Sequence, residues 1–195
     1  MDCARLDTKK CVLQDWVIVE QSLSSKLAEI VLPDSDGQEV RLGSLWADRP
    51  AVIVFMQHDG RIFCREHVAQ LRESEQTFRE KGASLAAIGL GDRHYARVFR
   101  EETGIPFPLL IDEEHRAYRV AGLASANLLH LLRKDNAASR KRARAEGHHQ
   151  HKLGKNPFQL GGSFVFSPGN VDRFVHISET FGDNATPDAL LAALP

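Results

Sequence analysis

Cysteine is scarce in this sequence, which has only Cys3, Cys11 and Cys64 among its 195 residues. So few thiols, odd in number, exclude the dense disulfide framework of small secreted domains. This usage is typical of a reducing compartment, and we expect a cytoplasmic protein. Cys3 and Cys11 lie in a polar, charged stretch near the N-terminus. A neutral role is the default interpretation for thiols placed there, and a reaction with another thiol is the alternative.

Long apolar runs are also missing. No stretch approaches the length of a membrane span, and the charged N-terminus lacks the apolar centre of a signal peptide. We therefore expect no membrane partner. The hydrophobic content of 43% and charged content of 26% are those of an ordinary globular protein. The length suffices for one domain with a sizeable core.

The common motifs for cofactors are incomplete. The stretch Gly89-Leu-Gly-Asp92 follows an expected strand, but His94 stands where a dinucleotide-binding loop needs its third glycine. Gly154-Lys155 lacks the upstream glycine of a phosphate-binding loop. The run His148-His-Gln-His151 has no cysteine or carboxylate at regular ligand spacing nearby. We therefore expect neither a metal nor an organic cofactor.

Charge is unevenly distributed although the net charge is only −1. The segment from Arg133 to Lys155 carries eight basic and two acidic residues, a net charge of +6. It has no aromatic residue before Phe158, whereas nucleic-acid sites commonly stack bases on aromatic rings. We interpret this basic segment as a solvated helix face, and binding of a nucleic acid or an anionic partner is the alternative.

The order of strands and helices predicts the fold class. Apolar runs, turn signals and helical spacing alternate along the chain after a leader at 1–25. They predict a hairpin at 29–42, strands at 51–56, 83–90 and 107–112, helices at 64–81, 94–102 and 114–146 (broken near Gly122), a hairpin at 162–177 and a last helix at 187–194. Pro108 cannot donate a ladder hydrogen bond, so strand 107–112 is expected at a sheet edge. We predict one α/β domain, residues 26–195, with a mixed central sheet flanked by helices.

Cys64 stands at the junction of a buried-type strand and a helix. Backbone N–H groups without partners and the positive end of the helix dipole favour a thiolate there. The dipole contributes about 0.3–1 kcal/mol, less than the roughly 1.36 kcal/mol of one pKa unit. Arg61 and Arg65 are the candidate additional cations. A reactive thiolate is therefore one interpretation of Cys64, and a buried, inert thiol is the other.

The chain resembles the thioredoxin fold, and within it the peroxiredoxin-like 2 group related to alkyl hydroperoxide reductases. Three stretches carry the resemblance over about residues 26–194: the hairpin at 29–42, His58-Asp-Gly-Arg-Ile-Phe-Cys64-Arg-Glu, and Gln159-Leu-Gly-Gly-Ser-Phe-Val-Phe166. The Ser-Pro-Gly-Asn170 hairpin and the C-terminal helix also match. The expected fold is thus a thioredoxin-like, peroxiredoxin-like sandwich.

The chain departs from the family pattern at the cysteine motif. The family usually has Cys-x-x-Cys, but Arg61 occupies the first position, so this motif provides no dithiol. Peroxiredoxins proper have Pro-x-x-x-Thr/Ser-x-x-Cys, and here Gln57 and Arg61 stand at the proline and threonine positions. The arginine that usually helps to hold peroxide would fall near Gly161.

The resemblance implies a thiol-dependent peroxidase-like oxidoreductase that works through Cys64 alone. It would reduce a peroxide or exchange a disulfide, with an external thiol of the thioredoxin or glutathione type as reductant. Arg61 and Arg65 would favour the thiolate, while His58, Gly161, Gly162 and Ser163 would contact the substrate. Cys11 or Cys3 is a candidate resolving thiol, and a homodimer is a possible assembly.

Two alternatives remain open at this stage. The chain could be a non-catalytic redoxin-fold module that binds a partner through the basic segment 133–155. It could also be a redox sensor in which modification of Cys64 alters binding. The two glycines at 161 and 162 would permit close approach of a ligand, or would serve only a bend where the strand begins.

Overall fold

The computed structural model describes residues 21–57, 62–125 and 159–195, with the backbone alone at residues 62–64. The helices and strands follow the predicted order, with an additional short helix at each side of the first hairpin. They are α1 Leu23–Ala28, β1 Val31–Pro33, β2 Glu39–Arg41, the 3₁₀ helix η1 Leu42–Trp46, β3 Ala51–Phe55, α2 Ile62–Glu80, β4 Ser84–Gly89, α3 Arg93–Thr103, β5 Leu109–Ile111, α4 Arg116–Val120, β6 Gly162–Ser167, β7 Val171–Ile177 and α7 Pro187–Ala192.

Strand β3 lies at the centre of a mixed five-stranded sheet of order β5-β4-β3-β6-β7. It pairs in parallel with β4, which pairs in parallel with β5. On its other side β3 pairs antiparallel with β6, which continues into β7 through a hairpin. The expected mixed sheet is therefore confirmed, and β5 lies at its edge as Pro108 predicted.

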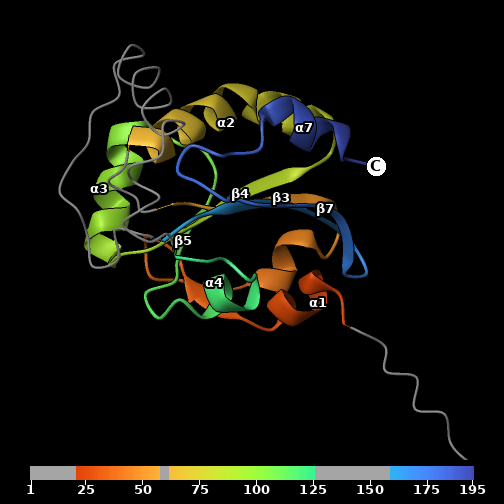
Figure 1. The fold of residues 1–195 in the computed structure, drawn as a ribbon, viewed down its shortest axis with the longest axis horizontal. Helices are drawn as coiled ribbons and strands as arrows, with labels where there is room; N and C mark the ends of the chain where they lie inside the picture. The colour runs from red at the N-terminus through yellow and green to blue at the C-terminus, as the bar shows by residue number, and fades with distance from the viewer. Residues whose placement is uncertain (1–20, 58–61, 126–158) are drawn as a thin grey trace, which may run out of the picture.

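Helices cover both faces of the sheet. Figure 1 shows α2 and α7 over one face and α1 and α4 over the other. Val52 and Val54 of β3 belong to the core under α2, while Ile53 and Phe55 belong to the core that includes α1 and α4 residues. All five residues of β3 are buried. A strand covered on both faces explains why this stretch has no polar alternation.

Tyr118 of α4 holds the carboxyl ends of the two central parallel strands together. Its hydroxyl oxygen lies 2.5 Å from the Met56 carbonyl oxygen and 2.9 Å from that of Ile88, so its single proton is shared between them. Asp112 in turn accepts hydrogen bonds from the backbone N–H groups of Arg116, Ala117 and Tyr118, which anchors α4. The end of β3 is therefore fixed from the helix layer as well as from its neighbouring strands.

Local capping signals set most of the helix ends. Asp92 caps α3 by accepting from the Tyr95 N–H, and Gly104 ends that helix in the left-handed conformation. Thr186 caps α7, because its hydroxyl accepts from the Ala189 N–H. Helix α1 was not predicted, although Ser22 caps it through the Ser25 N–H. Its shortness hides any helical periodicity.

The basic segment 133–155 lies outside the described residues, but both flanks of the stretch that contains it are held together. The Gln159 side-chain amide donates to the carbonyl oxygens of Leu123 and Ala124. Ser125 donates to the Gln159 side-chain oxygen at 3.2 Å. Residues 126–158 therefore begin and end at neighbouring points of the fold.

No helix within the described parts of the chain is long and apolar enough to cross a membrane. The longest of them, α2, carries charged residues along its whole length.

A buried histidine joins α2 to the segment before α7. His67 is 5% exposed, and its Nε2 lies 3.2 Å from the Ala185 carbonyl oxygen, which can only accept. Nε2 therefore carries the proton and donates it. Burial lowers the pKa of His67 to about 4, the Ala185 hydrogen bond opposes this fall, and the nearby His176 adds to it. His67 is consequently neutral near pH 7.

We expect this histidine to make the domain sensitive to mild acid. Between pH 6.5 and about 4 the unfolded chain binds a proton at His67 that the folded chain does not, so the free energy of unfolding falls as the pH falls. His67→Gln retains a donor but cannot titrate. Its pH dependence between pH 7.5 and 4.5, measured by urea unfolding, should be smaller than that of the parent by about 2–3 kcal/mol. The exposed His94 provides the control, His94→Gln, and equal slopes in all three proteins would contradict the expectation.

Candidate active site

The candidate site lies where the central strand leads into the longest described helix. Strand β3 ends at Phe55, Gln57 is the last described residue before α2, and α2 begins at Ile62 rather than at Cys64 as expected. Position 64 is therefore in the first turn of α2. The backbone N–H groups of a first turn have no partner within the helix and carry the positive end of its dipole.

Several predicted site residues fall outside the described part of the chain. These are Cys3, Cys11, His58 and Arg61. At Cys64 only the backbone is described. The roles of all five residues therefore stay predictions.

Arg65 lies beside Cys64 in sequence, but its guanidinium is engaged on helix α3. Its Nη2 lies 2.5 Å from a carboxylate oxygen of Glu102, and its guanidinium carbon is 5.4 Å from the ring centre of Phe99. The side chain is only 13% exposed. Consecutive residues of a helix do not share a face, so this placement is the one that helix geometry favours. Support of a thiolate by Arg65 stays a prediction.

Gly161 precedes β6 and lies against the end of β3. A Cβ atom at this position would be 2.3 Å from the Phe55 carbonyl oxygen and 3.0 Å from the Gln57 nitrogen. A Cβ at Gly162 would lie 2.8 Å from the His176 carbonyl oxygen. Both glycines thus permit close approach of protein backbone, and no peptide bond in the described residues is cis. Contact of a ligand with either glycine stays a prediction.

Ser163 is buried in β6, where it pairs with Val54 of β3 and His176 of β7. The strand register thus places it inside the sheet, next to the two glycines. Its role toward a substrate also stays a prediction.

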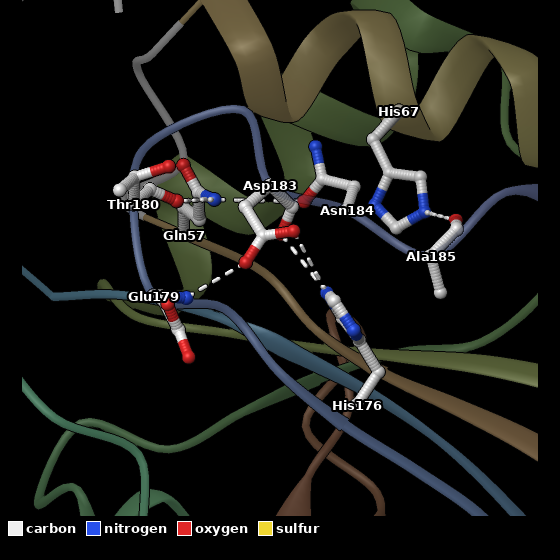
Figure 2. A network of polar contacts seen from close by, with 8 residues as sticks. All are labelled: Gln57, His67, His176, Glu179, Thr180, Asp183, Asn184 and Ala185. Atoms are coloured by element: carbon white, nitrogen blue, oxygen red, sulfur yellow. Dashed lines mark hydrogen bonds and ion pairs between the residues drawn. The ribbon is translucent and has the colours of Figure 1, made fainter. Parts of the chain in front are cut away.

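Gln57 is a buried polar residue that the sequence argument did not select as a site residue. Its amide nitrogen lies 3.5 Å from both the Thr180 carbonyl oxygen and the Asn184 side-chain oxygen, which are long hydrogen bonds. Both partners are acceptors, so the amide must present nitrogen to them. Its oxygen is buried without a partner among the described residues. Figure 2 shows that oxygen directed away from Asn184.

The segment Glu179–Ala185, which we call the C-terminal loop, contacts residues on both sides of Cys64. Gln57 precedes the cysteine and meets Thr180 and Asn184, while His67 follows it and meets Ala185 (Figure 2). Sequence reasoning missed this loop. Its composition around Gly182 signals a turn, but no local pattern shows that a turn at the C-terminus touches a helix far away in sequence.

Asp183 holds the C-terminal loop in shape. One carboxylate oxygen accepts from the Glu179 N–H at 2.8 Å, and the other lies 3.3 Å from Nε2 of His176 (Figure 2). The same histidine nitrogen is 3.2 Å from the Asp183 carbonyl oxygen. Gly182 has a φ of +83°, a left-handed conformation that glycine adopts without strain. The loop is thus tied to β7 on one side and to the site on the other.

The described residues place buried, hydrogen-bonded side chains around the start of α2, but they hold no metal-binding group. No cluster of three or more histidine, cysteine or acidic residues suited to a metal occurs within 21–57, 62–125 and 159–195. The chemistry that this arrangement can support is that of a cysteine in a first helical turn, where the local field favours a thiolate.

Comparison with proteins of known sequence finds relatives with redox names. The chain is 29% identical over 167 residues to peroxiredoxin-like 2C of Homo sapiens, covering 80% of this chain and 73% of that protein. It is 26% identical over 184 residues to the chloroplastic thioredoxin-like protein AAED1 of Arabidopsis thaliana, covering 90% and 74%. One of the two relatives is thus named for a compartment other than the cytoplasm, so the cytoplasmic location stays a prediction.

Solved structures share the fold. The crystal structure of peroxidoxin BcpB from Mycobacterium tuberculosis has a TM-score of 0.66 and 22% identity, covering 89% of this chain and 96% of that one. Peroxiredoxin Q of Xanthomonas campestris has a TM-score of 0.63 and 20% identity, covering 90% and 95%. The predicted thioredoxin-like, peroxiredoxin-like architecture is therefore confirmed.

A family profile agrees with these likenesses. The profile described as AhpC/TSA antioxidant enzyme matches residues 70–180, which begin after Cys64 and extend into the C-terminal loop. The match spans more than half of the chain, and it confirms the resemblance inferred from the cysteine motif and the order of elements. The chain belongs to the AhpC/TSA antioxidant enzyme family.

Proposed function

We propose that the protein is a thiol-dependent oxidoreductase of the peroxidase type and that Cys64 is its reacting residue. The observation that carries this proposal is the position of Cys64 in the first turn of α2, directly after the central strand of an AhpC/TSA fold. The names of the relatives support the same chemistry. Cys64 is also the only cysteine outside the N-terminal leader.

The proposed reaction balances with a peroxide and an external thiol. The Cys64 thiolate attacks one oxygen of the peroxide, the O–O bond breaks, and the cysteine becomes a sulfenic acid. The departing alkoxide takes up a proton and leaves as an alcohol, or as water from hydrogen peroxide. An external thiol then forms a mixed disulfide with Cys64 and releases water, and a second thiol restores the thiolate. A disulfide substrate would enter at the mixed-disulfide stage. This sequence requires no metal, flavin or nucleotide.

The remaining predicted residues receive supporting roles in this proposal. Arg61 stabilises the thiolate by its charge and donates to a bound peroxide oxygen. Arg65 adds a smaller contribution, because Glu102 balances its charge. His58 and the segment 161–163 contact the substrate. The reductant is a thiol of the thioredoxin or glutathione type, with Cys11 or Cys3 as the alternative resolving group. The protein acts in the cytoplasm, and a homodimer is the assembly that we propose.

A second candidate function is that of a non-catalytic partner-binding or redox-sensing module. It is favoured by the hydrogen bonds from Gln159 to Leu123 and Ala124, because they hold together the two flanks of the stretch that contains the basic segment. A positive segment anchored in this way would attract an anionic partner. Arginine in place of a second thiol at position 61 fits this function as well.

Removal of the sulfur tests the leading proposal. Cys64→Ser should fold normally and lose all peroxide consumption in the presence of a thiol reductant, because a serine hydroxyl does not ionise near neutral pH. The double variant Cys3→Ser, Cys11→Ser is the control and should retain consumption if the reductant is external. The proposal is wrong if Cys64→Ser consumes peroxide as fast as the parent.

The two arginines should differ in their influence on Cys64. Because the charge of Arg65 is balanced by Glu102 at 2.5 Å, Arg65→Gln should change the pH midpoint of Cys64 alkylation less than Arg61→Gln does. We expect Arg61→Gln to raise that midpoint by about one pH unit or less, the range of a partly exposed ion pair. A larger shift in Arg65→Gln would instead assign the thiolate-stabilising role to Arg65.

Removal of the basic segment tests the second function. Replacement of residues 126–158 by a short glycine-serine linker should leave the sheet folded, because the contacts of Ser125 and Gln159 already close the base. Circular dichroism and urea unfolding would check the fold. If the deletion variant still consumes peroxide, the result favours the enzyme. If the parent consumes no peroxide and the deletion abolishes partner binding, the result favours the module.

A further inference from the structure

The C-terminal loop contacts the chain on both sides of Cys64. Gln57 lies seven positions before the cysteine and His67 three positions after it. Both are almost fully buried, with exposures of 2% and 5%. One short segment therefore contacts both the end of β3 and the first turns of α2.

His67 is the more tightly held of the two anchors. Positions three apart lie on the same side of a helix, so His67 is one turn beyond position 64 along that side. Its hydrogen bond to the Ala185 carbonyl oxygen is 3.2 Å long and buried. A shift of Ala185 would therefore either move this side of α2 or leave the buried His67 N–H without its partner, which is unfavourable for a buried polar group.

The position of the loop depends in turn on Asp183. Its carboxylate bridges the Glu179 N–H and His176 of β7, and its neighbours Asn184 and Ala185 provide contacts to the two anchors. Phe181 and Ala185 are buried, at 1% and 6% exposure, so the loop has an apolar as well as a polar attachment. The side chain of Asp183 is 35% exposed, so it pairs with His176 at the surface of the loop.

We propose that Asp183 is a positioning residue for Cys64: by fixing the C-terminal loop, it holds Gln57 and His67, and through them it sets where the first turn of α2 lies relative to the end of β3. This inference rests on the proposed role of Cys64 as the reacting thiol. The field of a helix terminus falls off within one turn, so a small displacement of that turn changes the stabilisation of a thiolate. Loosening the loop therefore raises the pKa of Cys64 toward its ordinary value of about 8.5.

The direction of this change separates positioning from a simple charge effect. Asp183 carries a negative charge, and removal of a negative charge by itself lowers the pKa of a nearby thiol. A positioning role predicts the opposite sign. The sign of the shift in a variant that lacks the carboxylate therefore decides between the two.

The experiment compares Asp183→Ala and Asp183→Asn with the parent in the full-length chain. The rate of iodoacetamide alkylation is followed from pH 5 to 9.5 by mass spectrometry of the tryptic peptide 62–65, which reports Cys64 alone. Asp183→Ala should raise the midpoint by about half a pH unit, so that alkylation near neutral pH is about threefold slower. Asp183→Asn keeps an oxygen for the Glu179 N–H and should give a smaller rise.

Asp172→Ala is the matched control. Asp172 also lies on the chain after β6, and its carboxylate, like that of Asp183, accepts from the backbone, here from the N–H groups of Leu23 at 2.7 Å and Ser24 at 2.9 Å. Asp172 holds α1, which lies on the opposite face of the sheet (Figure 1). Its replacement by alanine should lower the free energy of unfolding without moving the pH midpoint of Cys64 alkylation. Urea unfolding of each variant provides the comparison of stability.

Each outcome bears on one of the two proposals. A rise in Asp183→Ala that is absent from Asp172→Ala supports positioning. No shift, a downward shift, or equal shifts in both variants overturns it, even if the parent is an active peroxidase. If the pH midpoint of alkylation in the parent equals that of free cysteine, the reactive thiolate is overturned instead. The positioning role is then judged by the limiting alkylation rate of Cys64, which should change in Asp183→Ala but not in Asp172→Ala.

Discussion

The pairing of β3 on both edges is the constraint on which the rest of this structure depends. Parallel bonds to β4 and antiparallel bonds to β6 leave the strand no freedom to slide or tilt. Tyr118 then ties Met56, the residue after β3, to the carboxyl end of β4. Because the chain runs from this fixed point toward α2, the sheet fixes one end of the segment that leads to Cys64.

The two sides of the sheet contribute differently to the site. The α1 and α4 side supplies Tyr118 and the core that supports the strand ends. The α2 and α7 side carries the helix with Cys64 and the C-terminal loop that contacts its flanks (Figures 1 and 2). The AhpC/TSA family profile ends within this loop, at residue 180. The contacts of Asn184 and Ala185 therefore lie outside the matched residues.

Much of the fold could be predicted because its signals are local. The apolar run of β3 is five consecutive residues, and the predicted starts of α3 and α7 lie within one residue of the observed ones. The edge position of β5 was predicted for the same reason, since Pro108 lacks a donor. Helix α1 escaped prediction because it is too short to show a period, and because Asp172, a residue on a distant strand, binds its first N–H groups.

The sequence by itself determined the order of elements, the single cysteine outside the leader and its place at a strand-to-helix junction. Each of these depends only on residues that are close together in the sequence. Only the tertiary structure decided what surrounds that junction. In the sequence Arg65 is a cation next to a thiol, but in the structure its guanidinium contacts Glu102 and Phe99 on α3. Gln57 and His67 read as ordinary polar residues, yet both contact a loop more than a hundred positions away. A side chain's partner depends on which helix faces pack together, and no local pattern contains that information.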